Sequence, residues 1–204
     1  MTTIDAYDAK KWHVVLVAAI TVFFIISSAS DGRAGDGLYA LNVYTARMST
    51  NHMGDFFNPN GDINFTDSYL VAATLAKRIG SWDEKASFEL EGQIVKHFHL
   101  QTHWEFNALA SARWEAFWWD NYLDTSVAFG IGPSYATDEP EIEIENDGKT
   151  ARFLVYLMVE LAVALPSYPH TALIVRIHHR SNAFGLVAEE GGSNALALGL
   201  KWTF

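Results

Sequence analysis

The sequence predicts an all-β protein, an eight-stranded antiparallel up-and-down transmembrane β-barrel. Eight segments of about ten to fourteen residues alternate apolar or aromatic side chains with polar or small ones. This two-residue period is typical of a strand whose two faces meet different surroundings. Strands of about 9–11 residues cross a bilayer at a tilt, and bacterial outer-membrane barrels contain even numbers of strands. Aromatic residues end several of the apolar rows, as the interfacial girdles of such barrels do.

Residues 103–114 show the alternation most clearly. Trp104 and Phe106 fall on one face of this segment, and Glu105 and Arg113 fall on the other. A soluble β-sandwich also alternates in this way, with its apolar faces packed inward, but the even count and the aromatic ends favour the barrel. The predicted strands are residues 38–48, 69–79, 87–98, 103–114, 123–134, 152–165, 171–182 and 194–204.

The N-terminus has the residue order of a secretory signal peptide. Two lysines precede an almost wholly apolar run at residues 14–26, and small residues follow. The run is short for a membrane-spanning helix, which needs about 20 apolar residues. We therefore expect a signal peptide at 1–30, with an approximate cleavage site, and the barrel at 31–204. An uncleaved anchor is the alternative.

Charge and composition argue against several functional classes. The formal net charge of −10 over 204 residues disfavours a nucleic-acid-binding surface. The chain has no cysteine, which excludes a disulfide framework and a thiolate metal site. It also lacks a glycine-rich phosphate loop and a dinucleotide-binding fingerprint. We expect neither a metal nor an organic cofactor.

The predicted topology assigns the loops to the two sides of the membrane. If both termini lie in the periplasm, the loops that follow the odd-numbered strands are external. Two of these loops, 49–68 and 135–151, are long and polar, as outer loops usually are. The turns expected on the periplasmic side are 80–86, 115–122 and 166–170.

The predicted strand 171–182 carries an aliphatic row that ends in His179 and Ser181. In a strand these two side chains point the same way, about 6 to 7 Å apart, so the imidazole can take the hydroxyl proton. Polar groups on a lipid-facing surface are costly unless function requires them. We predict that Ser181 attacks an acyl ester with His179 as the base, and that Asn182 or nearby backbone N–H groups stabilise the oxyanion. The alternative is that both residues merely mark the membrane interface.

The run His179–Ala183, followed by Gly185 and a short loop into a last strand, resembles the motif of the outer-membrane lipid A 3-O-deacylases (PagL-type). Segments 91–98 and 134–141 also look like parts of acyloxyacyl hydrolase-like envelope proteins. The resemblance implies an eight-stranded barrel in the bacterial outer membrane. It further implies a Ser and a His that act on the outer face of the wall and remove the 3-linked hydroxyacyl chain of lipid A, the lipid anchor of lipopolysaccharide.

The chain departs from that family at one position. The resemblance implies a glutamate early in the final strand as the third catalytic group, but the matching position lies near Ser193 and Asn194, and neither is acidic. Glu190 or Glu189, slightly earlier in the loop, could reach back to the histidine. Asn194 could orient the imidazole instead, as in Cys-His-Asn enzymes.

Two properties stay open at this point. The first is activity, since a non-catalytic structural or lipid-binding outer-membrane barrel that retains the motif is the alternative to the hydrolase. The second is assembly, because the sequence does not decide between a single barrel and a homodimer, nor does it identify the acyl chain that is cleaved.

Three histidines lie around a tight turn between two predicted strands. His97 and His99 share a face at metal-like spacing, and His103 follows the turn. Together with carboxylates such as Glu105, we expect them to form a hydrated polar network inside a narrow barrel rather than a metal site.

Two further groups of charged residues are expected to have structural roles. Glu141, Glu143 and Glu145 alternate along a strand-like stretch, and we expect a solvated acidic loop rather than a cation site. Arg176 lies on the face opposite to the Ser–His pair, and we expect it to pair with an interior carboxylate such as Glu160.

Overall fold

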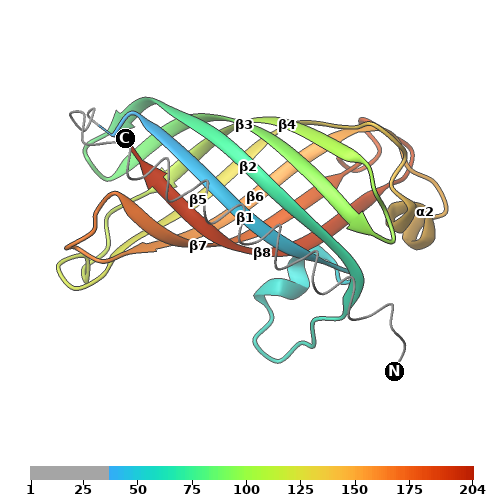
Figure 1. The fold of residues 1–204 in the computed structure, drawn as a ribbon, viewed down its shortest axis with the longest axis horizontal. Helices are drawn as coiled ribbons and strands as arrows, with labels where there is room; N and C mark the ends of the chain where they lie inside the picture. The colour runs from blue at the N-terminus through green and yellow to red at the C-terminus, as the bar shows by residue number, and fades with distance from the viewer. Residues whose placement is uncertain (1–36) are drawn as a thin grey trace, which may run out of the picture. The chain divides into compact units, whose positions relative to one another are not determined.

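The computed structural model describes residues 37–204, which form a closed barrel of eight antiparallel strands (Figure 1). Each strand pairs with its neighbours in the sequence, and the last strand closes on the first. The predicted fold class is therefore confirmed, while the predicted signal peptide lies outside the described residues. The strands are β1 (Tyr39–Ser49), β2 (Phe65–Trp82), β3 (Ala86–His99), β4 (Trp104–Trp114), β5 (Asp124–Ala136), β6 (Phe153–Ala164), β7 (Thr171–Ser181) and β8 (Gly192–Thr203).

The loops divide between the two ends of the barrel as the topology predicts (Figure 1). One end carries the connections that follow β1, β3, β5 and β7, and it includes the short helices η1 (Met53–Phe57) and α2 (Glu141–Asp147). We call this end the loop end. The opposite end carries the three remaining turns and the C-terminus. Neither helix among residues 37–204 has the length and apolar character needed to cross a membrane.

The largest difference from the predicted strand boundaries is in β2. It begins at Phe65 and continues to Trp82, so the loop before it is shorter than 49–68, and the turn after it is shorter than 80–86. That turn uses Asp83 and Glu84 in the left-handed region, at φ 50° and 53°. Polar strand ends that extend beyond the bilayer keep their hydrogen-bonded pairing, but they lose the apolar alternation by which a strand is identified in the sequence.

The acidic stretch after β5 is helical, so the expectation of a strand-like, solvated loop is wrong. Pro140 precedes the first turn of α2, where Glu141 and Glu143 lie favourably near the positive end of the helix dipole. Gly148 ends the helix at φ 78°, a left-handed conformation that favours glycine. Ile142 and Glu143 are buried, because this helix packs one face against the loop end of the barrel.

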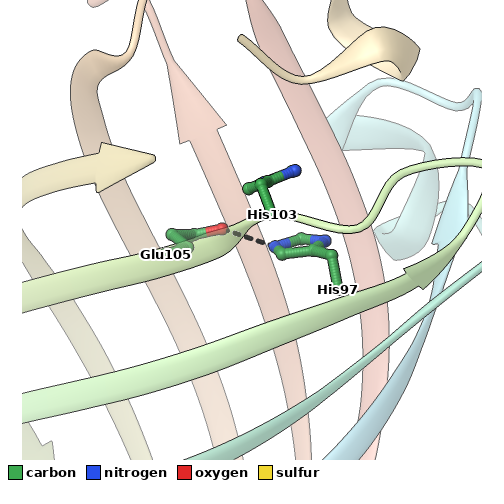
Figure 2. A group of neighbouring side chains, drawn as sticks. All are labelled: His97, His103 and Glu105. Atoms are coloured by element: carbon green, nitrogen blue, oxygen red, sulfur yellow. Dashed lines mark hydrogen bonds and ion pairs between the residues drawn. The ribbon is translucent and has the colours of Figure 1, made fainter. Parts of the chain in front are cut away.

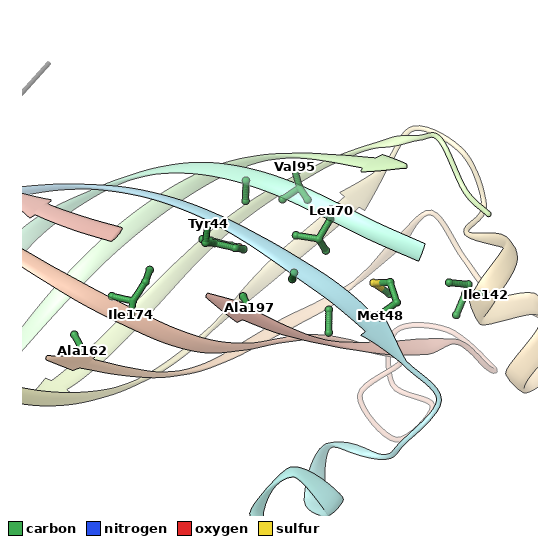
Figure 3. Packing of buried hydrophobic residues seen from close by; sticks show 11 residues of the cluster. Tyr44, Met48, Leu70, Val95, Ile142, Ala162, Ile174 and Ala197 are labelled. Atoms are coloured by element: carbon green, nitrogen blue, oxygen red, sulfur yellow. The ribbon is translucent and has the colours of Figure 1, made fainter. Parts of the chain in front are cut away.

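Side chains fill the inside of the barrel, as expected for eight strands. Part of the filling is apolar, and Figure 3 shows one cluster whose side chains come from β1, β2, β3, β6, β7 and β8 and from α2. Small residues in this cluster leave room for the larger ones. Its members are Tyr44, Ala46, Met48, Leu70, Ala72, Val95, Ile142, Ala162, Ile174, Ala195 and Ala197.

The rest of the filling consists of buried ion pairs. Arg176 on β7 lies between two carboxylates, with Nη1 2.7 Å from Oε1 of Glu91 and Nε 2.8 Å from Oε2 of Glu160. Arg113 on β4 binds the other oxygen of Glu160 at 2.7 Å and also contacts Glu89. The predicted pairing of Arg176 with Glu160 is confirmed, and the contacts link β3, β4, β6 and β7 through the barrel interior.

Removing one member of this network should destabilise the barrel strongly. Arg176→Leu leaves two buried carboxylates without their shared cation, and we expect a loss of about 3–5 kcal/mol. The measurement is the urea concentration at the midpoint of unfolding, and the folded fraction is monitored by the difference in gel migration between the folded and the unfolded barrel. Lys85→Gln is the control, because its pair with Asp83 is exposed and should contribute at most about 1 kcal/mol. Equal midpoints for the two variants would contradict this role of the network.

Candidate functional site

The Ser–His pair lies on the outer face of the barrel wall, near the loop end. Arg176, His178 and Arg180 on β7 are buried in the interior, so His179 and Ser181 point outward by the alternation of the strand. The register places His179 directly opposite Asn194 on β8.

His179 is held by a side-chain amide. Its Nδ1 lies 2.7 Å from Oδ1 of Asn194, whose Nδ2 in turn donates to the backbone carbonyl of Asn51 at 2.9 Å. Because a carbonyl accepts from the amide nitrogen, the amide oxygen must be the atom that faces the histidine. The oxygen can only accept, so the proton of neutral His179 lies on Nδ1 and the lone pair lies on Nε2.

Asn51 is itself fixed by the loop between β1 and β2. Its Oδ1 accepts from the backbone N–H of Asn64 at 2.6 Å, and its Nδ2 donates to the carbonyl of Asp62 at 3.0 Å. Ser49, the last residue of β1, donates to the same Oδ1 at 3.0 Å. A role for Asn51 was not predicted from the sequence, where the only sign of it is a polar loop rich in asparagine.

The two glutamates predicted as alternatives for orienting the histidine lie elsewhere in the structure. Both Glu189 and Glu190 are exposed in the loop between β7 and β8. The carboxylate of Glu189 pairs with Lys149 at 3.3 Å. The group in contact with Nδ1 of His179 is therefore the amide of Asn194.

Ser181 accepts a hydrogen bond from the backbone N–H of Ala183, 3.1 Å from its Oγ. Within the described residues 37–204, Ser181 and His179 form no direct hydrogen bond. Such bonds are often long in enzymes without bound substrate. Ala183 and the two residues after it have left-handed backbones, at φ 54°, 58° and 82°, and this turn directs an N–H group at the serine.

The side chain of Asn182, predicted to stabilise the oxyanion, points toward the loop. Its Nδ2 donates to the carbonyl of Glu189 at 3.2 Å, and its backbone N–H donates to the carbonyl of Gly191 at 3.0 Å. The N–H group that donates to the Ser181 hydroxyl is thus that of Ala183. Backbone donors near Ser181 were predicted in general, but Ala183 was not identified from the sequence.

An arginine lies on the same outer face, on β1. Arg47 is exposed, its Nε donates to the carbonyl of Thr66 at 2.9 Å, and its guanidinium lies 5.5 Å from the ring centres of Phe65 and Tyr69. It pairs with Leu196 in the β1–β8 register, two residues from the Asn194 position. These contacts hold a positive charge on the outer wall, next to the strand that carries Asn194.

The inside of the wall behind the Ser–His pair is anchored by Arg180, which lies between the two residues in the chain. Its Nη1 binds Oε1 of Glu143 in α2 at 2.8 Å, and Ser193 donates to the same oxygen at 2.8 Å. The predicted solvation of Glu143 is therefore wrong. Its carboxylate connects α2 to the ends of β7 and β8.

A polar cluster formed by His97, His103 and Glu105 lies inside the barrel (Figure 2). His97 contacts Oε2 of Glu105 through Nε2 at 2.8 Å, and the ring of His103 stacks on that of His97 with centroids 4.1 Å apart. His99 points away and pairs with Asp67 at 3.3 Å. The predicted interior polar network is thus present without His99. Burial and the neighbouring His97 lower the pKa of His103 to about 3, so this imidazole is neutral at pH 7.

Comparison with known proteins gives a family match and similar folds. A model of the family described as "Lipid A 3-O-deacylase (PagL)" matches residues 67–203, more than half of the chain. No curated protein sequence matches the chain. The crystal structure of the outer membrane enzyme PagL superposes with a TM-score of 0.59 at 10% identity, covering 81% of this chain and 99% of that chain. For Neisserial surface protein A the TM-score is 0.50 at 12% identity, and the coverage is 85% and 100%.

Proposed function

The chain belongs to the lipid A 3-O-deacylase (PagL) family of the bacterial outer membrane, and from this membership we propose that it hydrolyses an acyl ester of lipid A in the outer leaflet. The observation that carries the proposal is the contact between His179 and Asn194 on the outer wall, beside Ser181. A histidine with its free nitrogen outside a barrel, next to a hydroxyl group, is arranged for attack on a lipid rather than on a soluble substrate.

The proposed reaction is a two-step acyl transfer. Nε2 of His179 takes the proton of Ser181 as Oγ attacks the ester carbonyl, and the N–H of Ala183 donates to the developing oxyanion. The imidazolium then gives its proton to the departing sugar hydroxyl. A water molecule, activated by the same histidine, hydrolyses the acyl-enzyme and releases the fatty acid. The loop end faces outward in this proposal, since that places Ser181 near the ester linkages of the outer leaflet.

Asn194 replaces the carboxylate that the family resemblance implies at this position. An amide fixes the tautomer of the histidine as a carboxylate does, provided that its oxygen faces Nδ1. The carbonyl of Asn51 meets this condition by accepting from the amide nitrogen. An amide contributes no charge to stabilise the imidazolium, so we expect a slower reaction than a carboxylate would support.

A non-catalytic lipid-binding barrel is the second candidate function. The observation that favours it is the neutral partner of His179, where the resemblance implies an acid. Neither the family match nor the fold supports a homodimer.

Replacing either member of the pair tests the catalytic proposal. We expect Ser181→Ala and His179→Ala to lower deacylation by roughly 10³-fold or more, because each removes a group that acts in every turnover. Mass spectrometry of lipid A incubated with the purified barrel in detergent measures the loss of one acyl chain. Glu145→Gln, a change in α2 away from the pair, is the control. Unchanged lipid A with a folded wild-type barrel would favour the lipid-binding function.

The identity of the group that orients His179 is a separate test. Asn194→Leu keeps the volume but leaves the imidazole without its partner, and we expect kcat to fall by about 10²–10⁴-fold with KM nearly unchanged. Glu189→Gln and Glu190→Gln should retain wild-type kcat. A loss confined to Glu190→Gln would transfer the role to that residue and contradict the assignment of Asn194.

Arg47 is proposed to bind an anionic group of the lipid. A guanidinium forms strong bidentate contacts with phosphate, and the ring contacts of Arg47 fix it on the same outer face as the Ser–His pair. We expect Arg47→Gln to raise KM by about tenfold, or about 1.4 kcal/mol of binding, with kcat unchanged. Lys77→Gln, on β2 near the opposite end of the barrel, should change neither constant.

A further inference from the structure

The polar group inside the loop end of the barrel has no part in the proposed hydrolysis, because it lies on the inner face of the wall. We propose that His97, His103 and Glu105 bind one divalent transition-metal cation of the zinc type. Two imidazoles and one carboxylate form a common protein donor set for Zn²⁺, which coordinates such groups at about 2.0–2.2 Å. One ligand atom from each of the three residues lies within 4.8 Å of the others.

The local fold brings these donors together. His97 is near the end of β3 and Glu105 is near the start of β4, and both point into the barrel, as Figure 2 shows. His103 belongs to the tight connection between the strands, so its ring lies over that of His97. All three residues are at least nine-tenths buried. They can therefore surround a cation without much competition from bulk solvent.

Two buried atoms next to this group lack a hydrogen-bond partner among residues 37–204. One is Nε2 of His103, and the other is Oε1 of Gln101, whose Nε2 contacts Nδ1 of His97 at 3.1 Å. Buried polar atoms are rarely left unpaired, since each unpaired group costs about 1–3 kcal/mol.

A single cation would give both atoms a partner, binding Nε2 of His103 directly and supplying Oε1 of Gln101 with an N–H donor on His97. Nε2 of His103 and Nε2 of His97 would coordinate it together with Oε2 of Glu105. The proton of His97 would then move to Nδ1, and a rotated Gln101 amide would accept it through Oε1. This is the usual arrangement, in which a ligating histidine donates its other N–H to a carbonyl oxygen. The contact between His97 and Glu105, now 2.8 Å, would open to about 3.3 Å, the ligand spacing of a tetrahedral ion.

The surroundings already orient the carboxylate for this role. Oε1 of Glu105 is bound by Nε2 of His178 at 2.9 Å and by Nδ2 of Asn107 at 2.8 Å, and this leaves Oε2 for the cation. The nearby positive charge of Arg180 is compensated by Glu143.

Zinc titration of the chelator-treated, folded barrel in detergent tests the site. We expect calorimetry to give one Zn²⁺ per barrel, and His103→Gln to bind at least about tenfold more weakly. Co²⁺ in place of Zn²⁺ should give the visible absorption of a tetrahedral ion, which His103→Gln should abolish. His99→Gln is the matched control, because His99 lies on the same hairpin but pairs with Asp67, and it should bind as the wild type does.

Heat-modifiable migration shows that each variant is folded. Gln101→Leu gives a second test that leaves all three ligands in place, and we expect it to weaken binding by about tenfold. Absence of zinc binding by the folded wild-type barrel would overturn the proposal. Equal affinities of the wild type and His103→Gln would also overturn it, since the ion would then bind elsewhere. Neither result depends on the deacylase activity.

Discussion

Closure of the hydrogen-bond ladder between β1 and β8 is the constraint on which the rest of this structure depends. In a bilayer every backbone N–H and C=O must find a partner within the protein, so an open sheet edge is not tolerated. Closure also fixes the register that pairs Asn194 with His179 on one side and with Ser49 on the other. The contact from Asn51 to Asn194 to His179 therefore exists only because the first and last strands meet.

The inward face of β7 contributes to the stability of the barrel, and its outward face carries the candidate site. Arg176 and Arg180 point inward, where buried carboxylates bind them, while His179 points outward beside them. A buried ion pair contributes little net free energy, but breaking one is costly, so these contacts restrict the strand to one arrangement. The ion pairs of Arg176 and Arg180 inside the barrel therefore help to fix the positions of His179 and Ser181 on the outer face.

The two-residue alternation of side chains along each strand explains what could be predicted from the sequence. Alternation identified the eight strands and placed His179 and Ser181 on one face, because both properties depend only on neighbours along the chain. Asn194 could not be chosen over Glu190 in the same way, since that choice depends on the register across two strands. The helix α2 was missed because the glutamates at 141, 143 and 145 alternate with other residues as in a strand. The burial of Glu143 could not be predicted either, because it depends on a contact with Arg180, 37 residues later.

The amide at position 194 has a physical consequence that a carboxylate would not have. An ionised group on the lipid-facing wall carries a large desolvation cost, and a neutral amide avoids most of it. The amide can orient His179 only while another group fixes which of its two ends faces the ring, and here the carbonyl of Asn51 does so. The loop between β1 and β2 thereby becomes part of the site's geometry. If a carboxylate stood at this position, either of its oxygens could accept the hydrogen bond from Nδ1 of His179. The loop between β1 and β2 would then not be needed to fix the orientation of that side chain.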